Sequence, residues 1–327
     1  MAQTLRMIDS ELKICDAIIY VLDARCPLSC INPKFDEFMG RKPVLFILNK
    51  IDLAAPGVKE QFIKSSQLPA NFAVITRDST KSGGRDVVIK ALQKLLADRI
   101  QTKLARGINK ILRVAVIGVT NCGKSTFINN MTNKGKTQTG NRPGVTRTKQ
   151  WVAITDNLWL LDTPGTLWPA FSNQQIGLNL AYVGSIKDEV LNLVELSESL
   201  LGDLEKLQPG AVMARFGADT LDGIARKRGC ILRGGAIDTV RAAKMVLTEF
   251  REGKIGKFNF DNLLWTAINT WTNPKGITAK IWPANFYPTI ISKSWRVITV
   301  AGWAKLTLSP CVMTWFILWK SKTAPKI

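Results

Sequence analysis

Residues 113–128 read Arg-Val-Ala-Val-Ile-Gly-Val-Thr-Asn-Cys-Gly-Lys-Ser-Thr-Phe-Ile, and this stretch decides the fold. Its first part is an apolar run typical of a strand buried on both faces, and its last part begins an apolar helical pattern. Between them, Gly118-Val-Thr-Asn-Cys-Gly-Lys-Ser125 is a glycine-rich loop in the strand–loop–helix setting of phosphate-binding loops. Backbone N–H groups of such a loop, with the helix N-terminus, converge on phosphate oxygens.

Other apolar runs predict more strands of the same kind. Residues 14–23, 43–49 and 72–76 are rich in Ile, Val and Leu without alternation, and a helical pattern spans 85–104. Strands that alternate with helices predict a mostly parallel sheet.

The pattern changes after a predicted strand hairpin formed by 151–155 and 158–162. Apolar stripes at helical spacing over 185–206 and 238–252 indicate a separate helical domain. The expected fold class is therefore α/β: a P-loop domain with a mostly parallel sheet, followed by a small all-α domain.

Residues 262–327 differ from the rest of the chain. They contain eight Lys and Arg, seven of the ten Trp, and no Asp or Glu, with no clear period. We interpret this stretch as an anomalous tail of uncertain structure, disordered or translated from an altered reading frame.

Composition excludes several functions. The chain has 45 Lys and Arg against 25 Asp and Glu, a net charge of +20 that predicts a polyanionic partner. It has no histidine, which excludes His-based acid–base catalysis and His-ligated metals. Six scattered cysteines indicate reduced thiols. No signal-peptide core is expected, and the longest uncharged apolar stretch, between Lys305 and Lys320, is too short to span a bilayer.

Asn49-Lys50-Ile51-Asp52 ends the apolar run 43–49 and predicts guanine recognition. Guanine presents two adjacent N–H donors, which the two oxygens of the Asp52 carboxylate can accept, whereas adenine lacks that pair. Lys50 can lay its stem over the base, and Asn49 can tie the loop to neighbouring backbone. With a P-loop in the same chain, the base is expected to belong to GTP or GDP.

Three more segments complete the expected site. Asp162-Thr-Pro-Gly165 ends an apolar strand, where Asp162 can hold Mg²⁺ through water and the Gly165 N–H can contact the γ-phosphate. Thr146 lies where a switch threonine would close on Mg²⁺. Residues 78–81, Asp-Ser-Thr-Lys, can contact the guanine oxygen through their backbone, although a plain Ser/Thr turn explains them equally well.

The order of these motifs is rotated. Conventional GTPases run from P-loop through switch threonine and DxxG to NKxD, whereas here Asn49–Asp52 and 78–81 precede the P-loop. A parallel sheet whose ends lie close together tolerates such a permutation. One consequence is that the DTPG segment leads directly into the helical domain, so nucleotide state can move that domain.

The chain resembles the circularly permuted GTPases of the ribosome biogenesis GTPase A (YlqF) type over about residues 1–260. The resemblance implies a role in late assembly of the large ribosomal subunit and binding of ribosomal RNA by the helical domain. The segments that carry it are Asp23-Ala24-Arg25, NKID at 49–52, GVTNCGKST at 118–126, RPGVT at 142–146, DTPGTLWP at 162–169, and the stretch from Arg226 to Lys254.

The sequence departs from this family in features that concern hydrolysis. Family members carry a histidine before the equivalent of Met1, so its absence predicts a truncated start or impaired hydrolysis. Thr166 has too short a hydroxyl to position water as the Gln of other GTPases does. Asn121 resembles the P-loop residue that holds K⁺ in potassium-activated GTPases, with ordinary loop hydrogen bonding as the alternative.

These arguments assign the site residues, with GTP or GDP, Mg²⁺ and K⁺ as ligands. Hydrolysis is assigned to Asn121, Lys124, Thr146 and Gly165, and the metal to Ser125, Thr146 and Asp162. Nucleotide binding is assigned to Asn49, Lys50, Asp52, Ser79, Thr80, Lys81, Asn121, Cys122, Gly123, Lys124, Ser125, Thr126 and Gly165.

We therefore expect a GTPase domain at 1–168, a helical RNA-binding domain at 169–261 and the tail at 262–327. Basic clusters within 134–149 and 226–257 suit salt-dependent phosphate contacts. The expected protein is a cytoplasmic, monomeric GTPase stimulated by K⁺ and by the ribosome, without stable membrane association. One alternative is a GTP- and RNA-binding module with negligible turnover; another is a membrane-peripheral GTPase that uses the tryptophan-rich tail.

Overall fold

The fold is taken from a computed structural model. It describes residues 11–33, 42–66, 68–81, 83–105, 111–132, 150–165, 167, 171 and 173–264, and the backbone of 296–300, 303–307 and 315–317.

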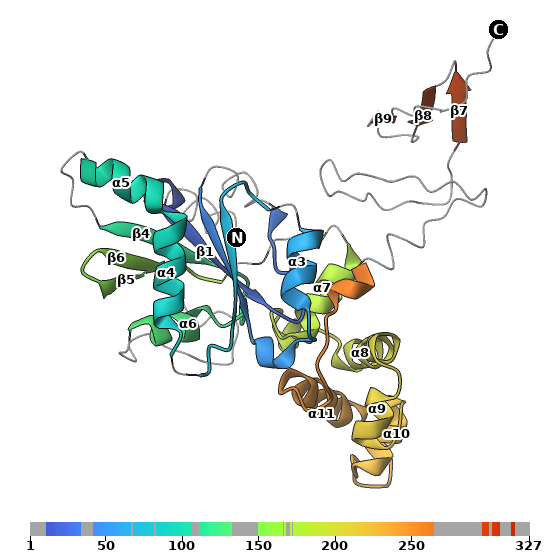
Figure 1. Cartoon of the computed structure of the whole chain (residues 1–327). Helices are drawn as coiled ribbons and strands as arrows, with labels where there is room; N and C mark the ends of the chain where they lie inside the picture. Colours follow the sequence, from blue (N-terminus) through green and yellow to red (C-terminus); the bar gives the residue numbers. More distant parts are fainter. Residues whose placement is uncertain are drawn as a thin grey trace. The chain divides into compact units, whose positions relative to one another are not determined.

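A six-stranded sheet forms the centre of the first domain (Figure 1). Its spatial order is β3-β2-β1-β4-β6-β5, and every neighbouring pair is parallel except β5 and β6. All residues of β1 and β2 are buried, as expected of strands covered on both faces. The predicted parallel sheet and hairpin are thus confirmed. The strands are β1 (Ala17–Asp23), β2 (Val44–Asn49), β3 (Phe72–Arg77), β4 (Leu112–Ile117), β5 (Gln150–Thr155) and β6 (Leu158–Asp162).

The helices of this domain connect the strands. The single helix predicted over 85–104 is wrong, because the chain forms two helices that meet at Leu96. Leu96 leaves the helical conformation with φ −103° and ψ 7°, so α4 ends there, although the residue is buried like Val88 and Leu92 of the same apolar stripe. The helices are α3 (Val58–Ser65), α4 (Arg85–Leu95), α5 (Ala97–Ala105) and α6 (Lys124–Thr132), with a 3₁₀ turn η2 (Ile51–Leu53).

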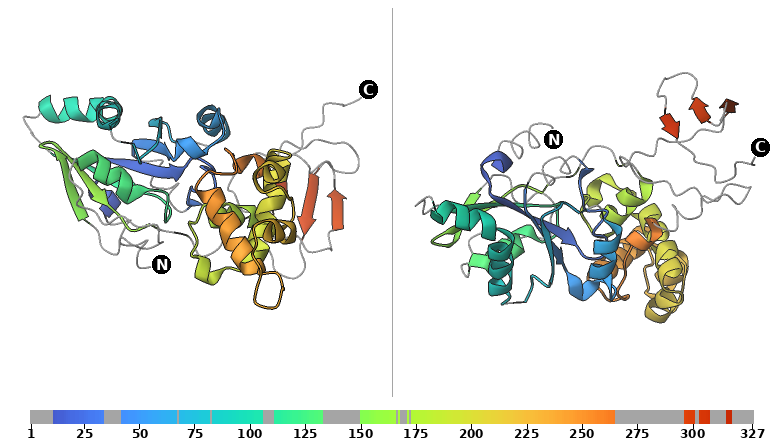
Figure 2. Two further views of the ribbon diagram at one scale, coloured as in Figure 1. Left: turned by 90° about the horizontal axis from the view of Figure 1, so that it is seen from below. Right: turned by 45° about the horizontal axis from the view of Figure 1, so that its top comes forward.

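Helices α7 to α11 form the second domain, in which α11 packs against α8 and α10 (Figure 2). The predicted helix over 238–252 is confirmed as α11, whose N-cap Asp238 accepts a hydrogen bond from the Arg241 N–H at 2.9 Å. The helices are α7 (Gln174–Tyr182), α8 (Leu193–Leu207), α9 (Ala211–Phe216), α10 (Leu221–Lys227) and α11 (Thr239–Arg251), with a 3₁₀ turn η3 (Asp188–Val190).

The helix predicted to begin at 185 instead begins at Leu193. The Asn192 side chain accepts hydrogen bonds from the N–H groups of Val194 and Glu195 at 3.2 and 3.5 Å, and so fixes the first turn of α8. Residues 185–192 form a turn and η3 instead, although their apolar side chains fit a helical stripe.

Three short strands in the tail form an antiparallel sheet that belongs to a compact unit of its own. They are β7 (Arg296–Val300), β8 (Trp303–Thr307) and β9 (Trp315–Ile317). The domain limits and the reading-frame hypothesis for the tail stay predictions. Among the described residues, no helix is both long and apolar enough to cross a membrane.

A buried polar network joins the two domains near the end of the helical part. The Asp261 carboxylate accepts hydrogen bonds from the Leu28 N–H at 2.6 Å and the Ser29 hydroxyl at 2.9 Å. The Asn179 amide of α7 donates to the same hydroxyl at 2.9 Å. Burial raises the pKa of Asp261 to about 6, although these hydrogen bonds to its charged form oppose the change.

We predict that Asp261→Asn changes the pH dependence of stability. A raised pKa means that protonation favours the folded state, so this contribution is present below about pH 4 and is lost as pH rises through about 6. The free energy of unfolding of the wild type, relative to that of the variant, should fall by roughly 2 kcal/mol over this interval. Urea unfolding of both proteins between about pH 4 and 6 measures this difference. If the free energies of unfolding of wild type and variant changed in parallel with pH, the raised pKa of Asp261 would be contradicted.

Candidate nucleotide-binding site

Five motif segments lie at the same edge of the six-stranded sheet. Asp23, Asn49, the 78–81 loop, Gly118 and Asp162 stand at or directly after the carboxyl ends of β1, β2, β3, β4 and β6. These strands are mutually parallel, so their carboxyl ends share one side of the sheet. This is the edge where open α/β sheets bind ligands.

The P-loop connects β4 to α6, which begins at Lys124. Its glycines are required sterically, because a Cβ on Gly118 would collide with the Val21 carbonyl, and one on Gly123 with the Asn49 amide. Gly123 also has φ +95°, a left-handed conformation that favours glycine. The Lys124 ammonium donates to the Gly118 and Val119 carbonyls at 3.0 and 2.7 Å, so it lies within the loop.

Asn49 joins three of the loops. Its Nδ2 donates to the Cys122 carbonyl of the P-loop at 2.9 Å, and its Oδ1 accepts from the Ser79 N–H at 3.0 Å. The side chain is 2% exposed, so these bonds are shielded from water. The predicted tie between this loop and neighbouring backbone is therefore observed.

The 78–81 loop combines the two interpretations that the sequence left open. Asp78 Oδ1 accepts from the Thr80 N–H at 3.0 Å, which is a local Asx turn. The same loop is also fixed toward the site, because Asn49 binds Ser79 and the Asn130 amide of α6 donates to the Ser79 carbonyl. Lys81 is largely exposed, with its ammonium 3.4 Å from the Asp78 carboxylate. The guanine-binding roles of these residues stay predictions.

A buried ionic cluster supports Lys50. The Asp23 carboxylate lies 2.9 Å from the Lys50 ammonium and receives two bonds from the Arg25 guanidinium, at 2.9 and 2.8 Å. Burial alone would raise the pKa of Asp23, but the charges and hydrogen bonds of Arg25 and Lys50 hold that pKa well below its usual range. Lys50 also donates to the Asn121 carbonyl at 2.7 Å and has a left-handed φ of 58°. Sequence reasoning noted Asp23 and Arg25 only as part of a family pattern.

Asp162 has the environment of a magnesium-site residue. It is 1% exposed, and neither carboxylate oxygen has a hydrogen-bond partner within the described part of the chain. Burial raises its pKa to about 6, and the Lys124 charge opposes this rise. An unpaired buried carboxylate beside the P-loop, with Ser125 in the first turn of α6, is a donor set that suits hard, oxygen-bound Mg²⁺.

The DTPG segment approaches the P-loop closely. A Cβ on Gly165 would lie 2.8 Å from Thr120 Cα and 2.9 Å from the Lys124 ammonium, so only glycine fits without displacement. The Thr163 hydroxyl anchors the segment by donating to the Val116 carbonyl at 2.7 Å. Thr146, the rest of 134–149, and Thr166 fall outside the described residues. The roles assigned to Thr126 and Gly165 stay predictions.

The P-loop also contacts the helical domain, which sequence reasoning missed. The Thr120 hydroxyl donates to the Ser185 carbonyl, and Asn121 Nδ2 donates to the Gly184 carbonyl at 3.3 Å. Asn121 therefore has a side-chain hydrogen bond to the helical domain, and its role toward K⁺ stays a prediction. No local pattern signals this contact, because the partners are more than 60 residues apart.

The described cysteine thiols are buried, and no role in the site is assigned to a thiol group. Cys15, Cys26, Cys30, Cys122 and Cys230 are free and buried, and burial raises the pKa of the Cys122 thiol. Cys122 contributes its carbonyl, which Asn49 binds. Among the described residues, no three or more His, Cys, Asp or Glu side chains cluster as a metal site would require, so Asp162 would bind Mg²⁺ together with Ser125 and not within a group of such residues.

Comparisons with known proteins identify the class. A family model described as 50S ribosome-binding GTPase matches residues 113–214. Ribosome biogenesis GTPase A of Bacillus cereus is 36% identical over 270 residues, which cover 80% of this chain and 91% of that protein. The mitochondrial ribosome-associated GTPase 1 of Bos taurus is 32% identical over 288 residues, with 80% and 86% covered.

Solved structures of YlqF resemble this chain in fold. The crystal structure of GNP-bound YlqF from T. maritima is 26% identical with a TM-score of 0.55, covering 79% of this chain and 97% of that one. A GDP-bound YlqF structure is 27% identical with a TM-score of 0.57, covering 78% and 98%.

Fold and site together define a P-loop GTPase with circularly permuted motifs. The chain belongs to the ribosome biogenesis GTPase A family. It is accordingly a GTPase that binds guanine nucleotide and has a role in ribosome assembly.

We predict that Asn49→Ala weakens GDP binding roughly tenfold to a hundredfold, because it removes two buried hydrogen bonds worth about 1 kcal/mol each and frees three loops. Fluorescent GDP titration measures the effect. Asn71→Ala is the matched control. Asn71 lies just before β3, at the opposite edge of the sheet, and among the described residues its exposed amide donates only to the Leu95 carbonyl, at 3.5 Å. Equal losses in both variants would contradict the role of Asn49.

We predict that Asp52→Asn shifts base preference from guanine toward xanthine, because the new amide can donate to the xanthine oxygen that replaces the guanine amino group. Competition between GDP and xanthosine diphosphate should change in favour of the latter by about tenfold or more, the value of one hydrogen bond to a charged group. An unchanged preference would remove Asp52 from the base site.

Proposed function

We propose that this protein is a GTP-dependent assembly factor that binds ribosomal RNA of the large subunit late in its maturation. GTP would favour the RNA-bound form, and hydrolysis, stimulated by K⁺ and by the ribosomal subunit, would release the protein. The observation that carries this proposal is the convergence of the P-loop, NKID and DTPG segments at one sheet edge, in direct contact with the helical domain. Within that domain, residues 226–257 contain nine Lys and Arg against three Asp and Glu.

The nucleotide is proposed to lie along that edge. Asp52 would accept from the guanine edge while Lys50, fixed by Asp23 and the Asn121 carbonyl, would lie over the base. The P-loop N–H groups and Lys124 would hold the phosphates. The structural relatives are GDP-bound and GNP-bound YlqF, which supports nucleotide binding by this chain.

Hydrolysis is proposed to depend on charge neutralisation around the γ-phosphate. Ser125 and Asp162 would hold Mg²⁺, together with Thr146. When bound, Mg²⁺ neutralises charge on the β- and γ-phosphate oxygens. Lys124 would move from the loop carbonyls to the phosphates, and the Gly165 N–H would contact the γ-phosphate. Asn121 would offer its Oδ1 to K⁺, which serves as a further positive charge.

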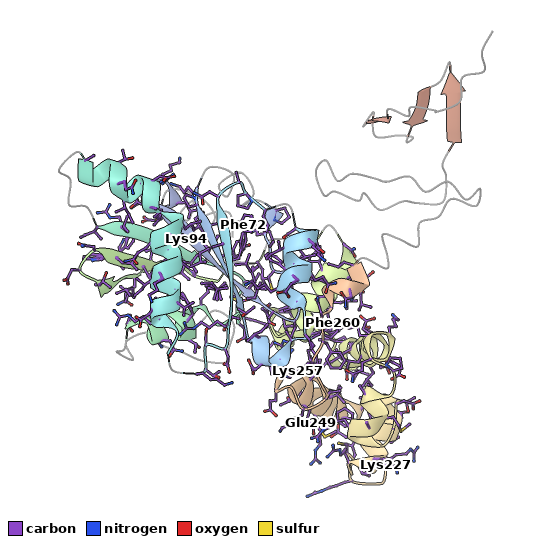
Figure 3. The ribbon with its side chains drawn as sticks, viewed as in Figure 1. Phe72, Lys94, Lys227, Glu249, Lys257 and Phe260 are labelled. Atoms are coloured by element: carbon purple, nitrogen blue, oxygen red, sulfur yellow. The ribbon has the colours of Figure 1, made fainter. Side chains whose placement is uncertain are left out.

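RNA binding is proposed for the exposed basic residues of the helical domain. Figure 3 places Lys227 at the end of this domain away from Phe260. Arg226, Arg233 and Lys244 are also exposed, as are the apolar side chains of Ile231, Leu232 and Val240. Positive charge beside exposed apolar surface suits contacts to phosphates and to unstacked bases. A monomeric, cytoplasmic protein without stable membrane association is part of the proposal.

A second candidate function is a GTP- and RNA-binding module with negligible turnover. The observation that favours it is that none of the 327 residues is histidine. The rate of GTP hydrolysis by this protein in the presence of isolated ribosomal subunits distinguishes the two functions.

We predict that purified large ribosomal subunits raise the rate of GTP hydrolysis at least about tenfold in KCl and less in NaCl, because a K⁺ at Asn121 neutralises transition-state charge. Lys124→Ala, which removes the phosphate-binding ammonium, is the inactive control. Tight GTP binding without stimulated hydrolysis would favour the binding module, and equal stimulation by small subunits would contradict the large-subunit assignment.

A further inference from the structure

Arg251, at the end of α11, donates hydrogen bonds from all three nitrogens of its guanidinium group. Its Nε donates to the Tyr182 carbonyl at 3.0 Å, and its Nη2 to the Ala181 carbonyl at 3.0 Å. Both terminal nitrogens also reach the Asp188 carboxylate, at 2.8 Å. The rigid guanidinium fork thus fixes the end of α7 to the start of η3. Although Arg251 belongs to the basic segment of the sequence, its guanidinium bonds within the protein.

The turn held by Arg251 is the one that contacts the P-loop. Gly184 and Ser185 follow α7, and their carbonyls accept from the Asn121 amide and the Thr120 hydroxyl. A Cβ on Gly184 would lie 3.1 Å from Asn121 Nδ2 and 3.3 Å from Arg251 Nε, so the glycine is enclosed between the two side chains. Its φ of +77° also favours glycine.

This contact determines how the Asn121 amide is oriented. The Gly184 carbonyl can only accept a hydrogen bond, so the amide must present Nδ2 to it and direct Oδ1 away. On the other side, Lys50 donates to the Asn121 backbone carbonyl at 2.7 Å. Asn121, with a left-handed φ of 57°, is therefore held by NKID through its backbone and by the helical domain through its side chain.

We propose that Arg251 is a positioning residue for the nucleotide site. It holds the Gly184–Ser185 turn, and the turn holds Thr120 and Asn121, so the P-loop keeps the conformation that binds nucleotide. Arg251 itself does not touch the phosphates. The part of this inference that concerns K⁺ rests on the proposed function, whereas the part that concerns the P-loop conformation does not.

The test uses the full chain and two readouts. Arg251→Gln removes the charged fork, and we expect release of fluorescent GDP to become about tenfold faster, the fold-change for one charge-assisted hydrogen bond lost. Arg251→Lys, which keeps the charge but not the fork, should be intermediate. Lys187→Gln is the matched control, because it removes an exposed positive charge next to Asp188.

The second readout is the ratio of intrinsic GTP hydrolysis rates in KCl and NaCl, which should fall toward one in Arg251→Gln. Thermal unfolding accompanies both measurements, since a merely structural arginine would lower the melting temperature without changing GDP release below it. GDP release at the wild-type rate in both folded Arg251 variants would overturn the proposal. A wild type with equal rates in both salts would contradict the K⁺ part of the proposed function, and GDP release would still decide the role of Arg251.

Discussion

The site depends on one buried amide. Asn49 binds the P-loop through the Cys122 carbonyl and the 78–81 loop through the Ser79 N–H, so loops after β2, β3 and β4 share a single side chain. Its place at the end of β2 is fixed by pairing with Asp23 on one side and Arg77 on the other. Since both bonds are shielded from water, a change at one loop is expected to reach the others through this residue.

A second constraint is electrostatic. Asp23 is buried among two cations, Arg25 and Lys50, and breaking such a cluster by removing one partner typically costs about 3–5 kcal/mol. Arg25 also lies over the Phe250 ring of α11, 5.3 Å from its centre, and its carbonyl accepts from the Phe260 N–H at 2.8 Å. Arg25, which holds Asp23 beside Lys50, thus also packs against the helical domain.

Local sequence was sufficient to predict the strands, the parallel sheet, the motifs and their permuted order, because each depends on a short contiguous pattern. Prediction from local sequence failed where contacts between distant segments determine the structure. The chain leaves the helical conformation at Leu96, which apolar spacing alone does not reveal, and the Asn192 cap places the start of α8 later than predicted. The Lys50 partner of Asp23 and the contacts of Arg251 come from segments distant in sequence, and single side chains carry no signal of such partners.

A crystal structure with GDP and Mg²⁺ tests the central claim most directly, that the five segments at the carboxyl edge of the sheet form one guanine-nucleotide site. The account predicts the base against Asp52 and Lys50, the phosphates within residues 118–125, and unchanged bonds from Asn49 to Cys122 and Ser79. Nucleotide bound away from this edge, or bound there only after those Asn49 bonds break, would contradict it.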